Sequence, residues 1–228
     1  MISVLFFASL RDVAGTSQLQ LESRGQQTAE EVFARLLKRF PGLAPYRPSL
    51  LVAVNEEYAQ WQQPVADGDE IAFFPPVSGG SGASAAKTGQ GWADLTRDAI
   101  DHQAVMDSVA HAGAGAVVTF DGVVRDHARG KNVTSLEYQC YESMARKQLE
   151  RLRLQALEKW PLRGVCVVHR VGHLQIGDSS VFIAVSSAHR GEAFQACRWI
   201  IDTLKTSVPI WKKEHYQDGE TWIEESGG

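Results

Sequence analysis

The sequence predicts two α+β domains joined by a flexible linker. The chain has 228 residues, which suits two small domains better than one, because domains cluster near about 100 to 150 residues. Residues 79–91 are mostly Gly, Ser and Ala, which offer little to pack and are typical of a linker. Apolar residues at 44% and charged residues at 22% are ordinary for a chain that folds. We therefore expect domains at 1–80 and 92–228, with the linker at 81–91.

The first domain is expected to hold one helix against a small sheet. Thr28 and Glu31 make a capping box at the start of that helix, and Pro41-Gly42 end it. Apolar and alternating patterns place the strands at 2–8, 18–21, 50–54 and 70–74. A sheet that has antiparallel strands at its edges and packs around one helix, within 80 residues, is the β-grasp, or ubiquitin-like, arrangement. Its tail, from Pro75 to Gly80, has stiff prolines and then bare glycines, so it should project as a slender strip.

The second domain is expected to be an α+β sandwich, because its patterns alternate hairpins with helices. The expected strands are 114–124, 134–140, 165–171 and 181–186, and the expected helices are 103–112, 143–160 and 191–205. Gly113 should close the first of these helices. The last helix is expected to bury Ala193, Phe194, Cys197, Ile200, Ile201 and Leu204.

Several classes of protein are excluded by the composition. The longest apolar stretch, 112–120, is about half of the roughly 20 residues that a membrane span needs. Residues 1–10 lack the positive leader of a signal peptide, and we interpret them as a strand. Three separated cysteines without a Cys-x-x-Cys pair favour a reducing, cytoplasmic location. Residues 1–80 hold 6 basic and 9 acidic side chains and residues 81–228 hold 17 and 18, so neither half indicates nucleic-acid binding.

Two groups of basic residues are candidates for a functional site. His189 and Arg190 stand at the start of a helix, where an anionic ligand and plain capping are both consistent with the sequence. Lys205, Lys212 and Lys213 flank an apolar stretch. Such lysines are either partly desolvated, with a pKa lowered toward use in catalysis, or simply solvated at the end of a helix.

Histidine and cysteine patterns do not indicate a metal or a nucleophile. His169 and His173 have a zinc-like spacing, but they lie in a strand and turn without a third ligand nearby. Cys140, Cys166 and Cys197 fall inside apolar patterns and are expected to be packed thiols.

The length of the last helix bears on the quaternary structure. Arg190 and Lys205 are separated by about 22 Å along a straight helix, at roughly 1.5 Å per residue. One small-molecule pocket cannot hold both ends of that helix. If both groups are functional, a second copy of the chain must supply one of them, which predicts a homodimer.

Several motifs, in the right order, resemble the two subunits of molybdopterin synthase. Residues 1–80 are similar to the small, sulfur-carrying subunit through Ile2 to Ala8 with Arg11, Val54-Asn55, Asp67 to Glu70 and above all Phe73 to Gly80. Residues from about 92 to 224 are similar to the large, catalytic subunit, which has a hammerhead fold, through Gly115 to Phe120, Val124-Arg125, His169 to Gly172, Ser187 to Arg190, Leu204 to Thr206 and Trp211-Lys212. The chain therefore resembles a fusion of both subunits.

The resemblance implies a sulfurtransferase of molybdenum cofactor biosynthesis. It would deliver two sulfurs to cyclic pyranopterin monophosphate and so form molybdopterin. The sulfur would travel as a thiocarboxylate on Gly80, behind Gly79, after activation by an adenylyltransferase/sulfurtransferase. The slender tail suits this work, because glycines carry no side chains and can enter a narrow channel.

The resemblance also implies roles for the basic residues. Arg125, His189 and Arg190 would bind the substrate, since guanidinium groups recognise phosphate. Lys205 and Lys212 would act in catalysis, and Lys213 would be a neighbouring substrate contact. A homodimer through the second domain, heterotetramer-like after cleavage, is implied as well. No cofactor or metal is called for.

The chain departs from the separate carrier in one respect, because Gly80 continues into Ser81 and its carboxyl is an amide. We hypothesise that a protease cuts after Gly80. A second diglycine, Gly227-Gly228, has no carrier tail before it, and we interpret it as coincidence. Two rival functions stay open: a ubiquitin-like modifier or sulfur carrier fused to a non-catalytic partner domain, and a lysine-dependent Schiff-base enzyme.

Overall fold

The computed structural model describes residues 1–76 and 90–223. The chain divides into two compact units, Met1–Pro76 and Val77–Gly228, and each is considered by itself. The predicted boundary at residue 80 and most of the predicted linker lie outside the described residues and stay predictions. Gln90 already bridges Gly164 in the second unit. Gly91 has a φ of +96°, and a Cβ there would lie 2.1 Å from the Val165 carbonyl oxygen, so only glycine fits.

The first unit is a β-grasp, which confirms the predicted fold. Its sheet has the order β2-β1-β7-β4-β5, with β1 and β7 parallel at the centre and the other pairs antiparallel. The strands are β1 (Ile2–Phe6), β2 (Gln18–Leu21), β4 (Leu51–Val54), β5 (Glu57–Ala59) and β7 (Glu70–Phe74), and the short β3 (Gln27–Thr28) and β6 (Pro64–Val65) pair separately. The helices are α1 (Ser9–Ala14), α2 (Ala29–Arg39) and a 3-10 turn, η1 (Pro41–Tyr46).

Helix α2 begins where its cap was predicted. Thr28 Oγ1 accepts a hydrogen bond from the Glu31 amide at 3.3 Å, and Glu31 Oε2 accepts one from the Thr28 amide at 2.8 Å. Phe33 of the helix is buried and packs against Phe73 at a ring-centroid distance of 5.1 Å. The first strand ends at Phe6 rather than Ala8, because α1 begins at Ser9.

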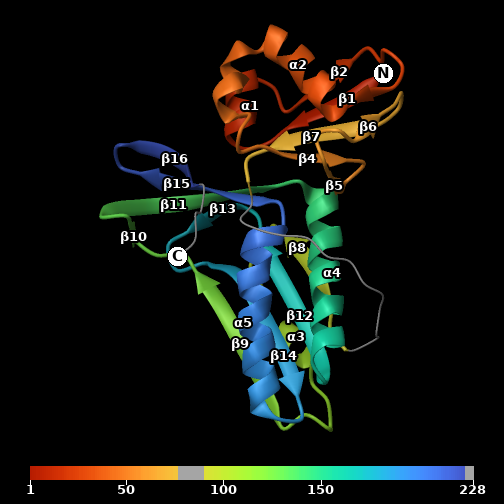
Figure 1. Cartoon of the computed structure of the whole chain (residues 1–228). Coiled ribbons are helices and arrows are strands. Elements are labelled where there is room, and N and C mark those ends of the chain that lie inside the picture. The colour runs from red at the N-terminus through yellow and green to blue at the C-terminus, as the bar shows by residue number, and fades with distance from the viewer. Residues whose placement is uncertain (77–89, 224–228) are drawn as a thin grey trace. The chain divides into compact units, whose positions relative to one another are not determined.

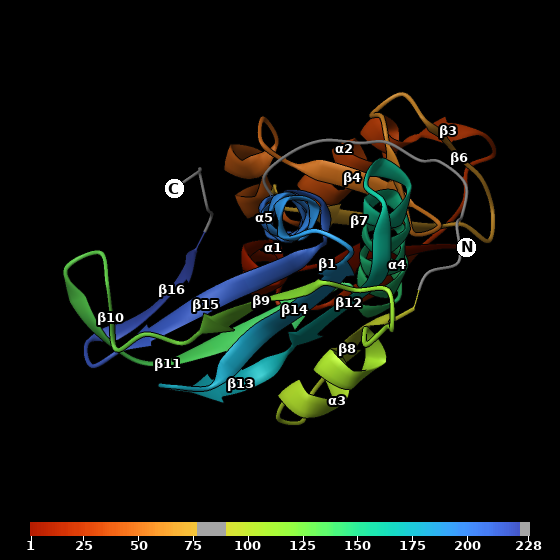
Figure 2. The ribbon, with the colours of Figure 1, turned by 90° about the horizontal axis from the view of Figure 1, so that it is seen from below.

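A four-stranded sheet of the second unit carries helices on both faces (Figures 1 and 2). Its strand order is β8-β12-β14-β9, and only the β8–β12 pair is parallel. The bounds are β8 (Ala93–Thr96), β9 (Ala116–Val123), β12 (Leu162–Arg170), β14 (Ser179–Ser187), α3 (His102–Ser108), α4 (Glu142–Lys159) and α5 (Arg190–Ser207). Helix α4 packs on β8 and β12, α5 packs on β14 and β9, and α3 covers the other face. This arrangement confirms the predicted α+β class.

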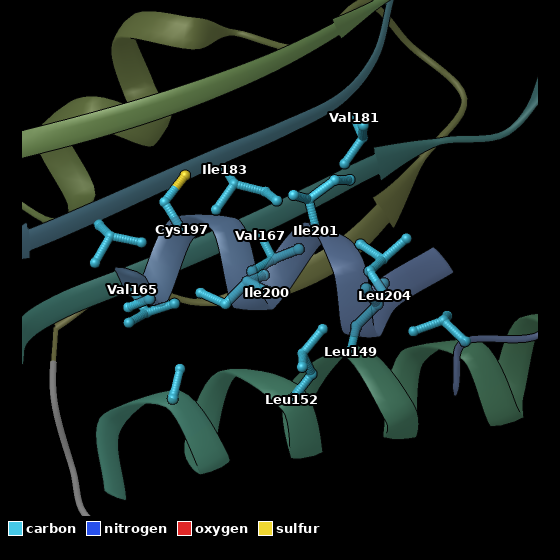
Figure 3. Packing of buried hydrophobic residues seen from close by; sticks show 14 of the residues in the cluster. Leu149, Leu152, Val165, Val167, Val181, Ile183, Cys197, Ile200, Ile201 and Leu204 are labelled. Atoms are coloured by element: carbon cyan, nitrogen blue, oxygen red, sulfur yellow. The ribbon is translucent and has the colours of Figure 1, made fainter. Parts of the chain in front are cut away.

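The core between this sheet and helices α4 and α5 is apolar throughout (Figure 3). Val165, Val167 and Ile183 of the sheet are fully buried, and they meet Leu149 of α4 and Ile200 of α5.

A second sheet has the order β10-β11-β15-β16, with β13 paired to β11. Its strands are β10 (His127–Ala128), β11 (Lys131–Cys140), β13 (Gly172–Gln175), β15 (Ile210–Tyr216) and β16 (Gly219–Ile223).

Two expectations for the second unit are wrong. Helix α3 ends at Ser108, capped by Val109, and does not extend to Gly113. Phe194 is 61% exposed, although its neighbours in the helical pattern are buried. The buried stripe of α5 runs through Ala193 and Cys197, and Phe194 is rotated about 100° from Ala193, onto the flank of the helix.

Among the described residues, no helix is both long enough and apolar enough to cross a membrane.

Candidate active site

Arg125 is positioned by the end of strand β9. The amide of the preceding Val124, which is buried, donates to the Asp178 carbonyl at 3.0 Å, and the Gly177 amide donates to the Val124 carbonyl at 2.9 Å. These bonds fix the point at which the chain leaves the sheet. The Arg125 side chain is exposed. Beyond it, Asp126 accepts from His127 at 2.6 Å, and this hydrogen bond, with the imidazole charge, lowers the pKa of Asp126.

His189 and Arg190 stand at the first turn of α5. His189 is the N-cap residue, and its side chain makes no capping hydrogen bond. Its amide donates weakly to Ser187 Oγ at 3.4 Å, and both basic side chains are exposed. Glu192 in the same turn already places a carboxylate near the positive end of the helix dipole. Anion binding at this end of the helix stays a prediction.

Lys205 and Lys212 lie on either side of the turn from α5 into β15. Lys205 is in the last turn of α5 and is exposed. Lys212 is 22% exposed, and its Nζ lies 3.6 Å from Oε1 of the buried Glu214. Tyr216 donates its hydroxyl to the same carboxylate, and this hydrogen bond, burial and the Glu214 charge raise the pKa of Tyr216. Strand alternation puts Lys212, Glu214 and Tyr216 on one face of β15.

Lys213 points to the other face of β15, because neighbouring residues of a strand alternate. Its Nζ donates to Glu220 Oε1 at 2.6 Å and lies 4.8 Å from the centroid of the Trp222 ring. The side chain is only 10% exposed. Glu220 and Trp222 of β16 thus hold the Lys213 side chain on the face of β15 opposite to Lys212.

The strand register separates the candidate residues into two groups. In the antiparallel pair of β14 and β9, Ser187 lies opposite Ala116 and Ser179 lies opposite Val123. Helix α5 follows β14 and runs back along the sheet. Arg190 therefore lies at the Ala116 end.

The second group lies at the opposite end of the same sheet. Arg125, which follows β9, and Lys205, in the last turn of α5, are both at the Val123 end. Lys212 joins them, because it lies opposite Tyr138 in the second sheet, and Tyr138 contacts His169 at 5.0 Å between ring centroids. A single copy thus brings Arg125, Lys205 and Lys212 to one end and leaves His189 and Arg190 about 22 Å away.

Burial shifts the pKa values of Cys140, Cys197 and His169 away from the range that suits catalysis near neutral pH. Burial raises the pKa of Cys140 and of Cys197 to about 11, and it lowers the pKa of His169 to about 4. His169 is 5% exposed, and its Nδ1 lies 2.8 Å from the Arg170 carbonyl oxygen. Within 1–76 and 90–223, no group of three or more His, Cys, Asp or Glu side chains is placed to hold a metal.

The hairpin of β15 and β16, with Glu214 and Tyr216, was not predicted from the sequence. Asp218-Gly219 between two alternating segments is a hairpin signal that would have revealed it. Gly79 and Gly80, the predicted carrier end, lie outside the described residues.

Two protein families match the chain. The MoaE protein family matches residues 95–207, and the ThiS family matches residues 4–80. The molybdopterin synthase catalytic subunit of Halalkalibacterium halodurans is 46% identical over 121 residues, which cover 53% of this chain and 78% of that protein. The catalytic subunit of Oryza sativa subsp. indica is 45% identical over 125 residues, covering 55% and 65%. This chain thus spans less than two thirds of the rice protein.

Solved structures show the same similarity. The crystal structure of molybdopterin synthase from Staphylococcus aureus superposes with a TM-score of 0.56 at 39% identity, covering 58% of this chain and 96% of that one. The MoaE protein from Burkholderia ambifaria superposes with a TM-score of 0.51 at 36% identity.

Proposed function

The chain belongs to the family of molybdopterin synthase catalytic subunits, and we propose that it makes molybdopterin from cyclic pyranopterin monophosphate with sulfur carried by its own N-terminal domain. The observation that carries this proposal is the joint presence of a ThiS-family domain and a MoaE-family domain in one chain. Together these domains support a role in molybdopterin biosynthesis. Sulfur transfer, cleavage and the individual residue roles are the finer parts of the proposal.

The sulfur donor is a thiocarboxylate on Gly80. A peptide bond to Ser81 blocks this carboxyl in the full chain, so a protease must first cut after Gly80. An adenylyltransferase/sulfurtransferase then joins the freed carboxylate to AMP from ATP, with pyrophosphate as the leaving group. Sulfide-level sulfur from a donor attacks the acyl carbon, AMP leaves, and the thiocarboxylate forms. Because molybdopterin contains two added sulfurs, each product consumes two charged carriers.

The substrate is an anion, and both groups of candidate residues supply cationic side chains to bind it. Arg125 and Arg190 can bind phosphate through the paired donors of a guanidinium, and His189 adds a donor beside them. Lys205 and Lys212 act where charge develops during sulfur transfer, one as a proton donor or acceptor and the other stabilising the departing carboxylate. The contact of Lys212 with Glu214 at 3.6 Å supports an orienting role for that carboxylate. We leave Lys213 out of the site because Glu220 and Trp222 already engage it.

Each site is shared between two copies of the chain. Arg190 and Lys205 stand at opposite ends of an 18-residue helix, so one copy cannot close both around a small substrate. In a dimer with two-fold symmetry, the start of α5 in one copy can face the end of α5 in the other, which forms two equal sites. After cleavage, two carriers and two catalytic domains make a heterotetramer-like assembly.

The test is a molybdopterin-forming assay with protein cleaved after Gly80, its activating enzyme, ATP and a sulfur donor. Lys205→Ala should abolish product formation, while Lys38→Ala, which replaces an exposed lysine of the first unit, should leave it unchanged. If Lys205→Ala left product formation intact, the proposed catalytic role would be wrong. Conjugation of the carrier to other proteins, without any pterin product, would favour the ubiquitin-like modifier instead. Borohydride trapping of a carbonyl substrate on a lysine would favour the Schiff-base enzyme.

A further inference from the structure

The turn that joins β13 to β14 holds the backbone immediately before Arg125. Within this turn the Asp178 amide donates to the Gln175 carbonyl at 3.1 Å, and Gly177 has a φ of +87°, as in a type II turn. The Asp178 carbonyl accepts from the Val124 amide at 3.0 Å, and the Gly177 amide donates to the Val124 carbonyl at 2.9 Å. Both backbone groups of Val124 are therefore bound to the turn.

Arg170, the last residue of β12, contacts the same turn through a carboxylate. Asp178 Oδ2 accepts a hydrogen bond from the Gln175 amide at 2.9 Å, and Arg170 Nη1 lies 3.1 Å from that oxygen. The Arg170 side chain is only 17% exposed, so this ion pair is screened less than one at the surface. The Arg170 backbone is fixed as well, because its carbonyl accepts from Nδ1 of the buried His169 at 2.8 Å.

The backbone on the other side of Arg125 is also held. The Asp126 carbonyl accepts from the Val133 amide at 2.8 Å. Val124 is buried in an apolar cluster with Leu136, and the side chain of Arg125, the next residue, is exposed. Because the residues before and after it are anchored, the direction of the Arg125 side chain depends on how firmly those anchors hold.

We propose that Arg170 is a positioning residue for Arg125. Through Asp178 it holds the turn that fixes the Val124 backbone, and so it determines where the Arg125 guanidinium meets the anionic substrate. This inference rests on the substrate-binding role proposed above for Arg125. Arg170 acts through Arg125 and does not itself touch the substrate.

The surroundings of Arg170 do not suit a purely stabilising role. Its Nε is buried and has no hydrogen-bond partner among the described residues. A buried donor without a partner is unfavourable, and a well-packed apolar side chain in place of a buried charge is often neutral or stabilising. Asp178 keeps the Gln175 amide and is partly solvated. Arg170→Met should therefore leave the urea midpoint almost unchanged while it loosens the turn.

Amide hydrogen exchange of the full chain tests the positioning independently of activity. In Arg170→Met, the Val124 amide should exchange about tenfold faster than in the wild type, because the turn that accepts its hydrogen bond opens more often. Arg170→Lys, which keeps a cation beside Asp178, should restore part of the protection.

Arg153→Met is the matched control for this measurement. Arg153 is also buried and pairs with a carboxylate, that of Glu150, at 2.7 Å. Its Nη1, like the Nε of Arg170, finds no partner within the part of the chain that the structure describes. Because Arg153 lies on α4 and has no contact with the turn, its replacement should leave the exchange of Val124 unchanged.

The KM for the pterin substrate, in the same molybdopterin-forming assay, tests the consequence. Arg170→Met should raise KM about tenfold to a hundredfold and change kcat by less than about twofold, because a displaced Arg125 weakens ground-state and transition-state binding alike. Arg125→Ala should also raise KM. Adding Arg170→Met to Arg125→Ala should raise it no further, because the two residues act as one unit. A further rise in the double variant would overturn the positioning role.

The two measurements separate this inference from the proposed function. Full protection of Val124, or an unchanged KM, in Arg170→Met while Arg125→Ala raises KM would overturn the positioning role alone. Loss of Val124 protection in Arg170→Met, together with an unchanged KM in Arg125→Ala, would overturn the substrate role of Arg125 and leave the contact between Arg170 and the turn standing.

Discussion

Mixing two inactive variants should restore about one quarter of the wild-type activity. Lys205→Ala removes one residue from the second group, and Arg190→Ala removes one from the first, so each homodimer has two defective sites. In a mixed dimer, one site combines the intact Lys205 of the Arg190→Ala copy with the intact Arg190 of the Lys205→Ala copy. The other site lacks both residues. Random pairing at equal amounts gives half mixed dimers, each with one working site of two, which is about one quarter of full activity. The assay is molybdopterin formation after co-expression of the two variants.

A second mixture provides the control. Lys205→Ala and Lys212→Ala change residues that lie at the same end of one copy, so every site of a mixed dimer still lacks one lysine. This mixture should recover nothing. If Arg190→Ala with Lys205→Ala also recovered nothing, although mixed dimers had formed, the shared site would be refuted.

Three further predictions concern the folded second unit. Burial lowers the pKa of His169 from 6.5 to about 4, so as the pH falls the unfolded chain takes up a proton on this residue before the folded chain does. The free energy of unfolding is therefore highest above pH 6.5 and falls by about 3 kcal/mol as the pH drops to 4. Urea unfolding of His169→Phe should show a shallower loss over that range. Cys140 and Cys197, with pKa values raised from 9.0 to about 11, should react with iodoacetamide roughly a hundredfold more slowly than a free thiol. Ile183→Ala should cost about 2 to 5 kcal/mol in urea unfolding, because Ile183 is fully buried.

Much of the fold could be predicted from the sequence because local signals and tertiary contacts agree there. The capping box of Thr28 and Glu31 marks the start of α2, and the β-rich run at 70–74 became the central strand β7. Helix α1 was missed because six residues provide too short a window for periodicity. Gly15, in the left-handed conformation at its end, was the only local sign of it.

The candidate site was predictable in its residue types but not in its geometry. Sequence spacing placed Lys212 and Lys213 together, whereas the alternation of β15 sends them to opposite faces. No strand is predicted from the sequence at residues 210–216, so the alternation of Lys212 and Lys213 is not part of the prediction. The length of α5, by contrast, could be derived from the sequence alone, and it already separated Arg190 from Lys205.

The central claim is that the Gly80–Ser81 bond opens and that the freed glycine carries sulfur. Intact-mass measurement of protein isolated from its own host tests it most directly. The expected result is two fragments, with the first ending at Gly80 and part of it heavier by the exchange of one oxygen for one sulfur. Only the uncut chain, in cells that make the cofactor with this protein alone, would contradict the claim.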